Sequence, residues 1–234
     1  MTQQHIASAF DRDLEDIQAK IMKMGGLVEA AILEGAISLE TRDEERAEKV
    51  RAADKAIDLL EEEINEDAAR LIALSSPTAG DLRLVLAIMK ISGNLERIGD
   101  YAKNMAKRTG VLAQMAPVSD SAGALRRMAK EVSKMLKDAL DAYIHRDTEL
   151  AGDVIERDSD VDQMYNGLFR EFLTFMMEDP RNITACMHLH FIGKNIERMG
   201  DHVTAIAEQV VYLVTGEYPE EARVKSDVTS TQTI

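Results

Sequence analysis

The feature that most constrains the fold is an internal repeat, because the 234-residue sequence resembles itself at a nearly fixed offset. Residues recur 104 positions later in the pairs Met24 and Met128, Arg42-Asp43 and Arg146-Asp147, and Asp58 and Asp162. The offset shrinks to 101 at Glu96 and Glu197, which indicates a shorter connection in the second copy. We therefore expect tandem units over 1–116 and 117–216, divided at the Pro117–Asp120 segment, and a flexible tail over 217–234.

Each unit is predicted to contain three helices. Aromatic residues make up only 4% of the chain, Trp is absent and four prolines leave long uninterrupted runs, a composition that favours helices over strands. The apolar residues Leu84, Ile88, Ile91, Leu95 and Ile98 alternate steps of four and three, which is the pattern of a helical bundle seam. The expected helices cover residues 5–41, 44–74, 79–110, 121–145, 148–177 and 181–214. The predicted fold class is all-α, with two three-helix up-down bundles in tandem.

Polar residues, prolines and glycines mark the expected helix ends. Asp43 and Asp147 can cap the second helix of each copy, with acidic residues in the first turn. The other signals are Pro77 and Pro180 in first turns, Gly110 and Gly216 as left-handed C-caps, and Gly25-Gly26 as a kink in the first helix.

Four acidic pairs with a spacing of four residues carry the strongest chemical signal. They are Asp54 and Asp58, Glu96 and Asp100, Asp158 and Asp162, and Glu197 and Asp201. Four residues rotate a helix by about 400°, so the carboxylates of a pair share one face. That face lies roughly 90° or more from the apolar seam, which points the acids outward or along a flank. If neighbouring helices turn these flanks toward each other, each copy gathers four carboxylates.

Such a cluster suits a metal ion. Like charges at this spacing repel unless a cation lies between them, and hard carboxylate oxygens favour Mg²⁺, Mn²⁺, Ca²⁺ or iron over structural zinc. Acidic pairs are also common on solvated helix faces, but their recurrence in equivalent positions of both copies favours a shared constraint. Gly99 and Gly200 precede the last acid of each copy and serve either close helix packing or clearance for a ligand.

The remaining candidate side chains are assigned structural roles. Arg97 and Arg198 are expected in ion pairs rather than on phosphate, and His202 is expected to be structural or solvated. The lone Cys186 cannot pair within the chain, and the sequence begins with no signal-peptide pattern, so a packing role and the cytosol are expected.

The net charge of -14 disfavours nucleic acid as a partner and favours basic partners or cations. No apolar run reaches the roughly 20 residues that a membrane-spanning helix needs. Any membrane association is therefore expected to be indirect.

Two strings in the predicted third helices resemble the signature of the PhoU family. They are Leu-Glu-Arg-Ile-Gly-Asp at 95–100 and Ile-Glu-Arg-Met-Gly-Asp-His at 196–202, with Pro-Thr-Ala-Gly-Asp-Leu-Arg at 77–83 before the first. The resemblance spans nearly the whole chain and implies metal clusters at the eight acids named above, holding iron, Mg²⁺ or Mn²⁺. The second copy departs from the pattern at Pro180–Ile183, so the two halves need not be equivalent.

The resemblance also implies a function. It predicts a negative regulator of the phosphate-starvation response, an adaptor between the ATPase subunit of the phosphate ABC transporter and a sensor histidine kinase. It further predicts a cytoplasmic homodimer without enzymatic activity that reaches the inner membrane only through its partners.

Two alternatives stay open at this point. One is a carboxylate-bridged metal enzyme, although no Glu precedes any His by three residues as ferritin-like sites require. The other is a metal-free helical scaffold whose acids only solvate it.

Overall fold

Six long helices and one short 3-10 turn form the chain in the computed structural model, which describes residues 2–75 and 77–219. The helices are α1 (Thr2–Thr41), α2 (Glu44–Ser75), α3 (Ala79–Ala113), α4 (Ser121–His145), α5 (Thr148–Glu178) and α6 (Ile183–Thr215), with η1 (Pro180–Asn182) before α6. The all-α prediction and the predicted order of helices are confirmed. Most of the expected C-terminal tail, from residue 220 onward, lies outside the described residues.

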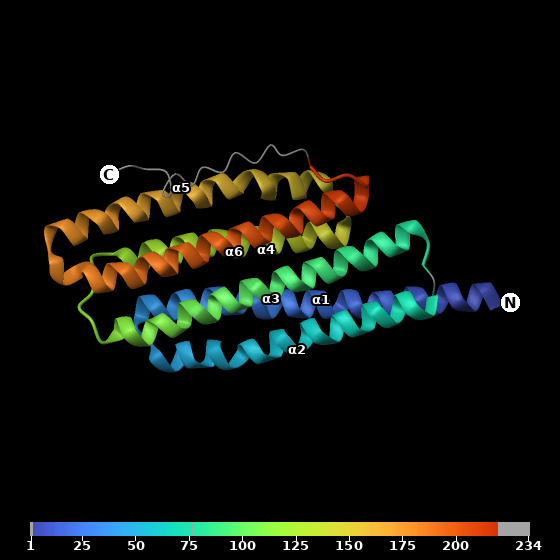
Figure 1. Cartoon of the computed structure of the whole chain (residues 1–234), viewed down its shortest axis with the longest axis horizontal. Coiled ribbons are helices and arrows are strands. Elements are labelled where there is room, and N and C mark those ends of the chain that lie inside the picture. Colours follow the sequence, from blue (N-terminus) through green and yellow to red (C-terminus); the bar gives the residue numbers. More distant parts are fainter. Residues whose placement is uncertain (1, 76, 220–234) are drawn as a thin grey trace.

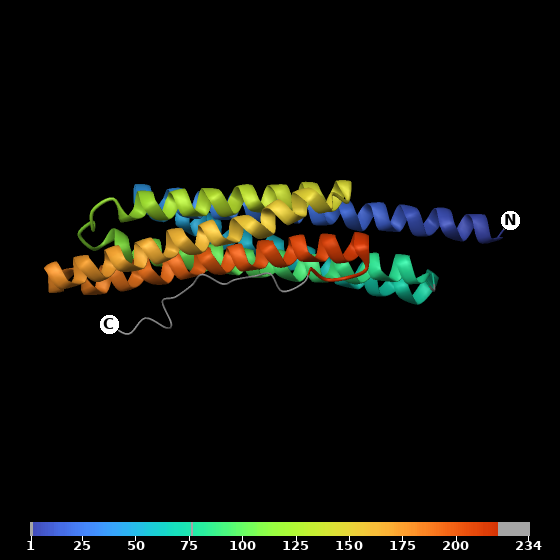
Figure 2. The same ribbon diagram turned by 90° about the horizontal axis from the view of Figure 1, so that it is seen from above.

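The two three-helix units lie side by side, with all helices roughly along one long axis (Figure 1). Helix α2 forms one edge and α5 the other, and seen from above, α1 and α4 lie on one side of the molecule and α3 and α6 on the other (Figure 2). Contacts between α1 and α4 and between α3 and α6 join the two units. Each copy therefore presents its third helix at the centre of one face, next to its own second helix.

The apolar seams of both copies merge into one core. Buried side chains of the two copies, including Ile98 and Ile196, belong to the same continuous cluster. Within the described part of the chain, no helix is long and apolar enough to cross a membrane. Cys186 is fully buried, which agrees with its expected packing role.

The capping predictions at the starts of α2 and α5 are confirmed. The Asp43 carboxylate accepts a hydrogen bond from the backbone N–H of Arg46 at 2.9 Å. Asp147 accepts from the N–H groups of Glu149 and Leu150, both at 3.0 Å. The residue before each cap, Arg42 or Arg146, has a left-handed backbone with φ of 55°. The repeat thus preserves the whole turn as well as the cap.

The prediction for the end of α6 is confirmed, whereas that for α3 is wrong. Gly216 ends α6 with φ of 85°. Gly110 does not end α3, which continues to Ala113. The helix continues because Leu112 is buried in the core, and this burial outweighs the helix-breaking tendency of one glycine.

The Pro77 and Gly25-Gly26 predictions also need correction. Pro180 lies in the first turn of η1, which leads directly into α6, as expected, but Pro77 lies before the N-cap Thr78 of α3 and outside its first turn. Helix α1 is continuous through Gly25, where an added β-carbon would lie 2.3 Å from Cδ1 of Leu140. Gly25 therefore allows α1 and α4 to approach closely.

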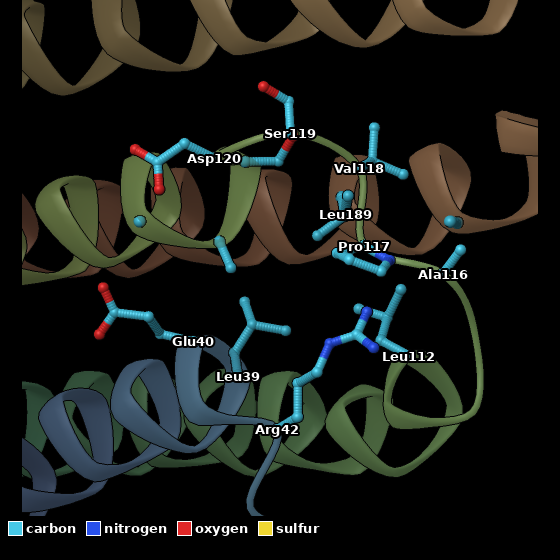
Figure 3. Close-up of a pocket in the computed structure, with 14 residues that line it drawn as sticks. Leu39, Glu40, Arg42, Leu112, Ala116, Pro117, Val118, Ser119, Asp120 and Leu189 are labelled. Atoms are coloured by element: carbon cyan, nitrogen blue, oxygen red, sulfur yellow. The ribbon is translucent and has the colours of Figure 1, made fainter. Parts of the chain in front are cut away.

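A pocket marks the junction where the chain passes from α3 to α4 (Figure 3). Its lining comes from both copies and from the expected boundary segment Pro117–Asp120. The Arg42 guanidinium donates to the carbonyl of Met115 at 2.8 Å, and Arg126 pairs with Glu40 across the junction. These contacts fix the linker against the two units that it connects.

Candidate cation-binding clusters

The eight predicted acids lie on two neighbouring helix pairs, four on α2 and α3 and four on α5 and α6. Cluster 1 is defined as Asp54, Asp58, Glu96 and Asp100, and cluster 2 as Asp158, Asp162, Glu197 and Asp201. The mutual proximity of the acids is evident in their electrostatics. Asp100 and Asp58 both help to raise the pKa of Glu96, and Asp201 and Asp162 both help to raise that of Glu197. The second and third helices of each copy therefore do turn their acidic flanks toward each other.

Of the two orientations expected for the acids, outward or along a flank, burial favours the flank for half of them. Asp54 is 4% exposed in cluster 1, and cluster 2 buries Asp158, Asp162 and Glu197 to between 5% and 6%. The acids lie on the flank of each seam, and the neighbouring helix covers that flank. Half of the predicted carboxylates are therefore buried. A charge buried without a partner is costly because it has lost its hydration.

In cluster 1 a lysine of α3 compensates part of the negative charge. The Lys103 ammonium lies 2.5 Å from Oδ2 of Asp54 and 3.2 Å from Oδ1 of Asp100. The hydrogen bond to Asp54 raises the pKa of Lys103 well above its ordinary value. The other oxygen of Asp54, Oδ1, is buried and has no hydrogen-bond partner.

The outer part of cluster 1 is half-buried. Arg97 lies 3.5 Å from Glu96 and 3.8 Å from Asp100, so its predicted ion-pair role is confirmed. Burial, followed by repulsion from Asp100, raises the pKa of Glu96. Burial and the neighbouring Asp54 do the same for Asp58.

In cluster 2 the charge compensation comes from different positions. Lys194 donates to Oε1 of Glu197 at 2.9 Å and lies 5.1 Å from the ring centre of Tyr165. The Thr204 hydroxyl donates to Oδ1 of Asp158 at 3.2 Å. Burial raises the pKa of Glu197 although Lys194 opposes the shift, and Oε2 of Glu197 is buried without a hydrogen-bond partner.

The glycine of each signature lies against the first acid and an aliphatic residue of the second helix. A β-carbon at Gly99 would lie 3.1 Å from Cδ1 of Ile57, and one at Gly200 would lie 3.4 Å from Cγ1 of Val161. Of the two roles considered for these glycines, close helix packing is the one that the contacts support. The close approach also brings each acidic pair of the second helix up to the third helix.

The side chains between the clusters join the two copies. Nδ1 of His202 lies 2.8 Å from Oδ1 of Asn94, and its ring packs on Tyr101. The guanidinium of Arg198 lies 5.9 Å from the ring centre of Tyr101 in the other copy, and the contacts described for it include no ion pair. The structural role expected for His202 is confirmed, and its place at the interface between the copies was not predicted.

The donor set fits a hard cation, but the described side chains are not arranged around one. Each cluster has a buried carboxylate oxygen without a donor, and a divalent cation could satisfy it. Among the described residues, no three Asp, Glu, His or Cys side chains converge closely enough to hold an ion as they stand. The acids would have to turn toward a shared point, and three of their carboxylates, those of Asp54, Asp100 and Glu197, already contact a lysine.

Lysine and threonine partners were missed at the sequence level. Lys103 follows Asp100 by three residues and Lys194 precedes Glu197 by three, a helical spacing that could have signalled both contacts. The contact of Thr204 with Asp158 spans 46 residues and has no local signal.

The fold and the clusters define a class: a tandem three-helix-bundle protein with an acidic cluster between the second and third helices of each bundle. Residues 21–109 and 125–210 each match the PhoU domain. The chain belongs to the PhoU family.

Relatives and solved structures agree with this assignment over nearly the full length. A phosphate-specific transport system accessory protein PhoU homolog from Rhizobium meliloti is 44% identical over 99% of this chain and 98% of its own. One from Zymomonas mobilis is 47% identical over 94% and 93%. The crystal structure of PhoU from Pseudomonas aeruginosa matches with a TM-score of 0.85 and 38% identity, covering 89% of this chain and 100% of that one. Family membership confirms that the chain is a regulatory accessory protein rather than an enzyme.

Proposed function

We propose that this protein is a negative regulator of the phosphate-starvation response. It acts in the cytoplasm as an adaptor between the ATPase subunit of the phosphate ABC transporter and a sensor histidine kinase. The observation that carries the proposal is the match of both repeats to the PhoU domain, together with relatives that are named as accessory proteins of phosphate-specific transport. Long helices with a net charge of -14 suit protein docking rather than nucleic-acid binding.

The proposal includes divalent cations at clusters 1 and 2, with a homodimer as the assembly. Support for the cations comes from the buried oxygens of Asp54 and Glu197 that lack a donor, and from the raised pKa of Asp58, Glu96 and Glu197. A cation bound there would add positive charge to the partial compensation that Arg97 gives Glu96 and Lys194 gives Glu197. Iron, Mg²⁺ and Mn²⁺ share the preference for oxygen ligands that such a site imposes.

Deletion of the gene tests the regulatory role. A strain without the protein should express phosphate-starvation genes at high phosphate, and the wild-type gene supplied in trans should restore repression. An unaltered response to phosphate in the deletion strain would remove the regulator proposal and leave a scaffold.

Metal analysis tests the clusters. We expect the purified protein to retain bound metal that is lost in the variant Glu96→Ala, Asp100→Ala, Glu197→Ala, Asp201→Ala. The matched control is Glu62→Ala with Glu66→Ala, an acidic pair of the same spacing on the exposed face of α2. Equal metal content in the wild type and the quadruple variant would reject the cation sites without touching the regulatory role.

A further inference from the structure

Each cluster contains a lysine, but the two lysines occupy different positions in the repeat. With the offset of 101 that holds in the third helices, Lys103 corresponds to Thr204, and Lys194 corresponds to Gly93. Lys103 enters cluster 1 from the C-terminal side of its acidic pair, whereas Lys194 enters cluster 2 from the N-terminal side. The copies therefore share a cationic group within the cluster without sharing the residue that supplies it.

In both clusters, the carboxylate that the lysine contacts has a second oxygen without a hydrogen-bond partner. Lys103 contacts Oδ2 of Asp54 at 2.5 Å while Oδ1 stays buried without a partner. Lys194 contacts Oε1 of Glu197 at 2.9 Å while Oε2 stays buried without a partner. In both clusters one oxygen of a carboxylate at most 6% exposed is neutralised and the other is not. The lysine thus compensates that one carboxylate only in part.

We propose that Lys103 and Lys194 are tethered counter-ions that occupy the clusters in the cation-free protein and leave when a divalent cation binds. The proposal rests on the cation sites of the proposed function and adds the exchange step. A divalent cation that coordinates Asp54 or Glu197 repels an ammonium group on the same carboxylate and draws electron density from it, which weakens the lysine contact and favours its release. The side chains of Lys103 and Lys194 are 39% and 27% exposed, which gives both a short path to solvent.

Exchange has two consequences for the protein. The fold does not depend on metal, because a lysine takes over part of the charge compensation when the cation is absent. The lysine also competes with the cation and lowers its apparent affinity, which keeps binding reversible. Lys194 has an additional contact with the ring of Tyr165, so its withdrawal breaks a cation–π interaction that Lys103 lacks among the contacts described for it.

Lysine acetylation of the wild-type protein tests the exchange directly. The full chain, stripped of metal, is treated with an acetylating reagent at limiting dose with and without saturating Mn²⁺, and modification is read by mass spectrometry. Lys103 and Lys194 should react several-fold faster with Mn²⁺, because release frees their amines from the carboxylates. Exposed Lys107, one turn beyond Lys103 on the same helix, should not change. Unchanged or slower reaction of both cluster lysines under saturating Mn²⁺ would overturn the exchange.

Methionine variants provide a second test. Lys103→Met removes the competitor and should raise the Mn²⁺ affinity of one site by about fivefold, the equivalent of one partly exposed ion pair. The cation-free variant should unfold at a lower temperature than the wild type, and excess Mn²⁺ should remove the difference. Lys107→Met, the matched control, should change neither quantity. An affinity equal to or below that of the wild type would contradict the proposal.

Direct measurement of Mn²⁺ bound after dialysis distinguishes failure of the cation sites from failure of the lysine exchange. Wild-type protein that binds no Mn²⁺ rejects the cation sites and the exchange together. Binding to the clusters without any change at Lys103 or Lys194 rejects the exchange alone and leaves the cation sites intact.

Discussion

Clusters 1 and 2 occupy equivalent places in the two copies but differ in depth. Cluster 1 buries one of its four acids, Asp54, and leaves the Glu96 and Asp100 side chains 25% and 33% exposed. Cluster 2 buries three of its four, and its Glu197 side chain is only 7% exposed. The same helix pair with the same acid spacing can therefore produce a shallow, solvent-screened cluster or a deep one.

The helix packing beside the two clusters also differs, and it is tighter at Gly99 than at Gly200. The position facing the signature glycine is Ile57 in the first copy and Val161 in the second. The larger side chain crowds Gly99, whereas the smaller one gives Gly200 an ordinary contact distance. Changes at these positions test whether the clusters differ through packing or through charge.

The largest expected effect is the loss of packing under cluster 1. Ile57 is 1% exposed, and Ile57→Ala should reduce the free energy of unfolding by about 3–4 kcal/mol through lost burial and a cavity. Val161→Ala removes fewer atoms and should cost about 2–3 kcal/mol. Urea denaturation in the presence of a chelator measures both. The control Leu59→Ala, at a position 49% exposed on the same helix as Ile57, should cost less than about 1 kcal/mol. A larger loss at Val161 than at Ile57 would contradict the packing difference.

The next effect is electrostatic and depends on pH. Burial raises the pKa of Glu197 above its ordinary value of 4.5, so the folded state binds a proton more readily than the unfolded chain. The contribution of protonated Glu197 to the stability of the folded state is complete below about pH 4.5 and is lost as the pH rises through the folded-state pKa. In metal-free protein, Glu197→Gln should flatten this decline and stabilise the protein near neutral pH.

The same substitution at Glu96 sharpens the comparison. Burial also raises the pKa of Glu96, but this side chain is more exposed, so Glu96→Gln should flatten the profile less. Urea midpoints between pH 4 and 8 in a chelating buffer provide the measurement. If Glu96→Gln flattened the pH dependence of the urea midpoint more than Glu197→Gln, cluster 2 would not be the more deeply buried cluster.

Much of this architecture follows from sequence because its signals are local or repeated. Helical periodicity, the caps at Asp43 and Asp147 and the spacing of four between acids each depend on residues within one or two turns. The recurrence of the acids in both copies then indicates which pairs belong together. Helix order and helix limits to within a few residues follow from these signals.

What sequence could not supply depends on contacts between distant segments. The antiparallel packing of α3 on α6, with His202 against Asn94, joins residues 108 positions apart and follows from no local pattern. The depth of cluster 2 also depends on how closely two helices approach, which Gly200 permits but does not specify. At Gly110 a local signal was overruled, because burial of Leu112 continues the helix beyond the glycine.

The interface between the clusters offers a smaller test. Asn94→Ala removes the partner of a half-buried imidazole and should cost about 1 kcal/mol. Burial lowers the pKa of His202 below its ordinary value of 6.5. The contribution of neutral His202 to the stability of the folded state is therefore complete above about pH 6.5 and is lost as the pH falls through the folded-state pKa. His202→Gln should remove this acid-side loss, which opposes the trend expected for Glu197. A pH profile unchanged by His202→Gln would exclude His202 as its source.

The smallest effect isolates the contact between the signature glycine and the second helix. Alanine is favoured over glycine inside a helix by about 1 kcal/mol. At Gly200 the added carbon would lie 3.4 Å from Val161, an ordinary contact, so Gly200→Ala should stabilise the protein by up to about 1 kcal/mol. At Gly99 it would lie 3.1 Å and 3.3 Å from two carbons of Ile57, so Gly99→Ala should gain nothing or lose about 0.5 kcal/mol.

A double-mutant cycle shows whether Ile57 is the cause of that difference. Ile57→Val removes the closer of the two carbons and gives the first copy the aliphatic residue of the second. Gly99→Ala in the Ile57→Val background should then become favourable, with a coupling free energy of about 0.5–1 kcal/mol. Additive effects would show that Ile57 does not set the difference, because the next contact of a β-carbon at Gly99, with Oδ1 of Asp54 at 3.7 Å, is an ordinary one and Gly200 has a similar contact with Asp158 at 3.5 Å.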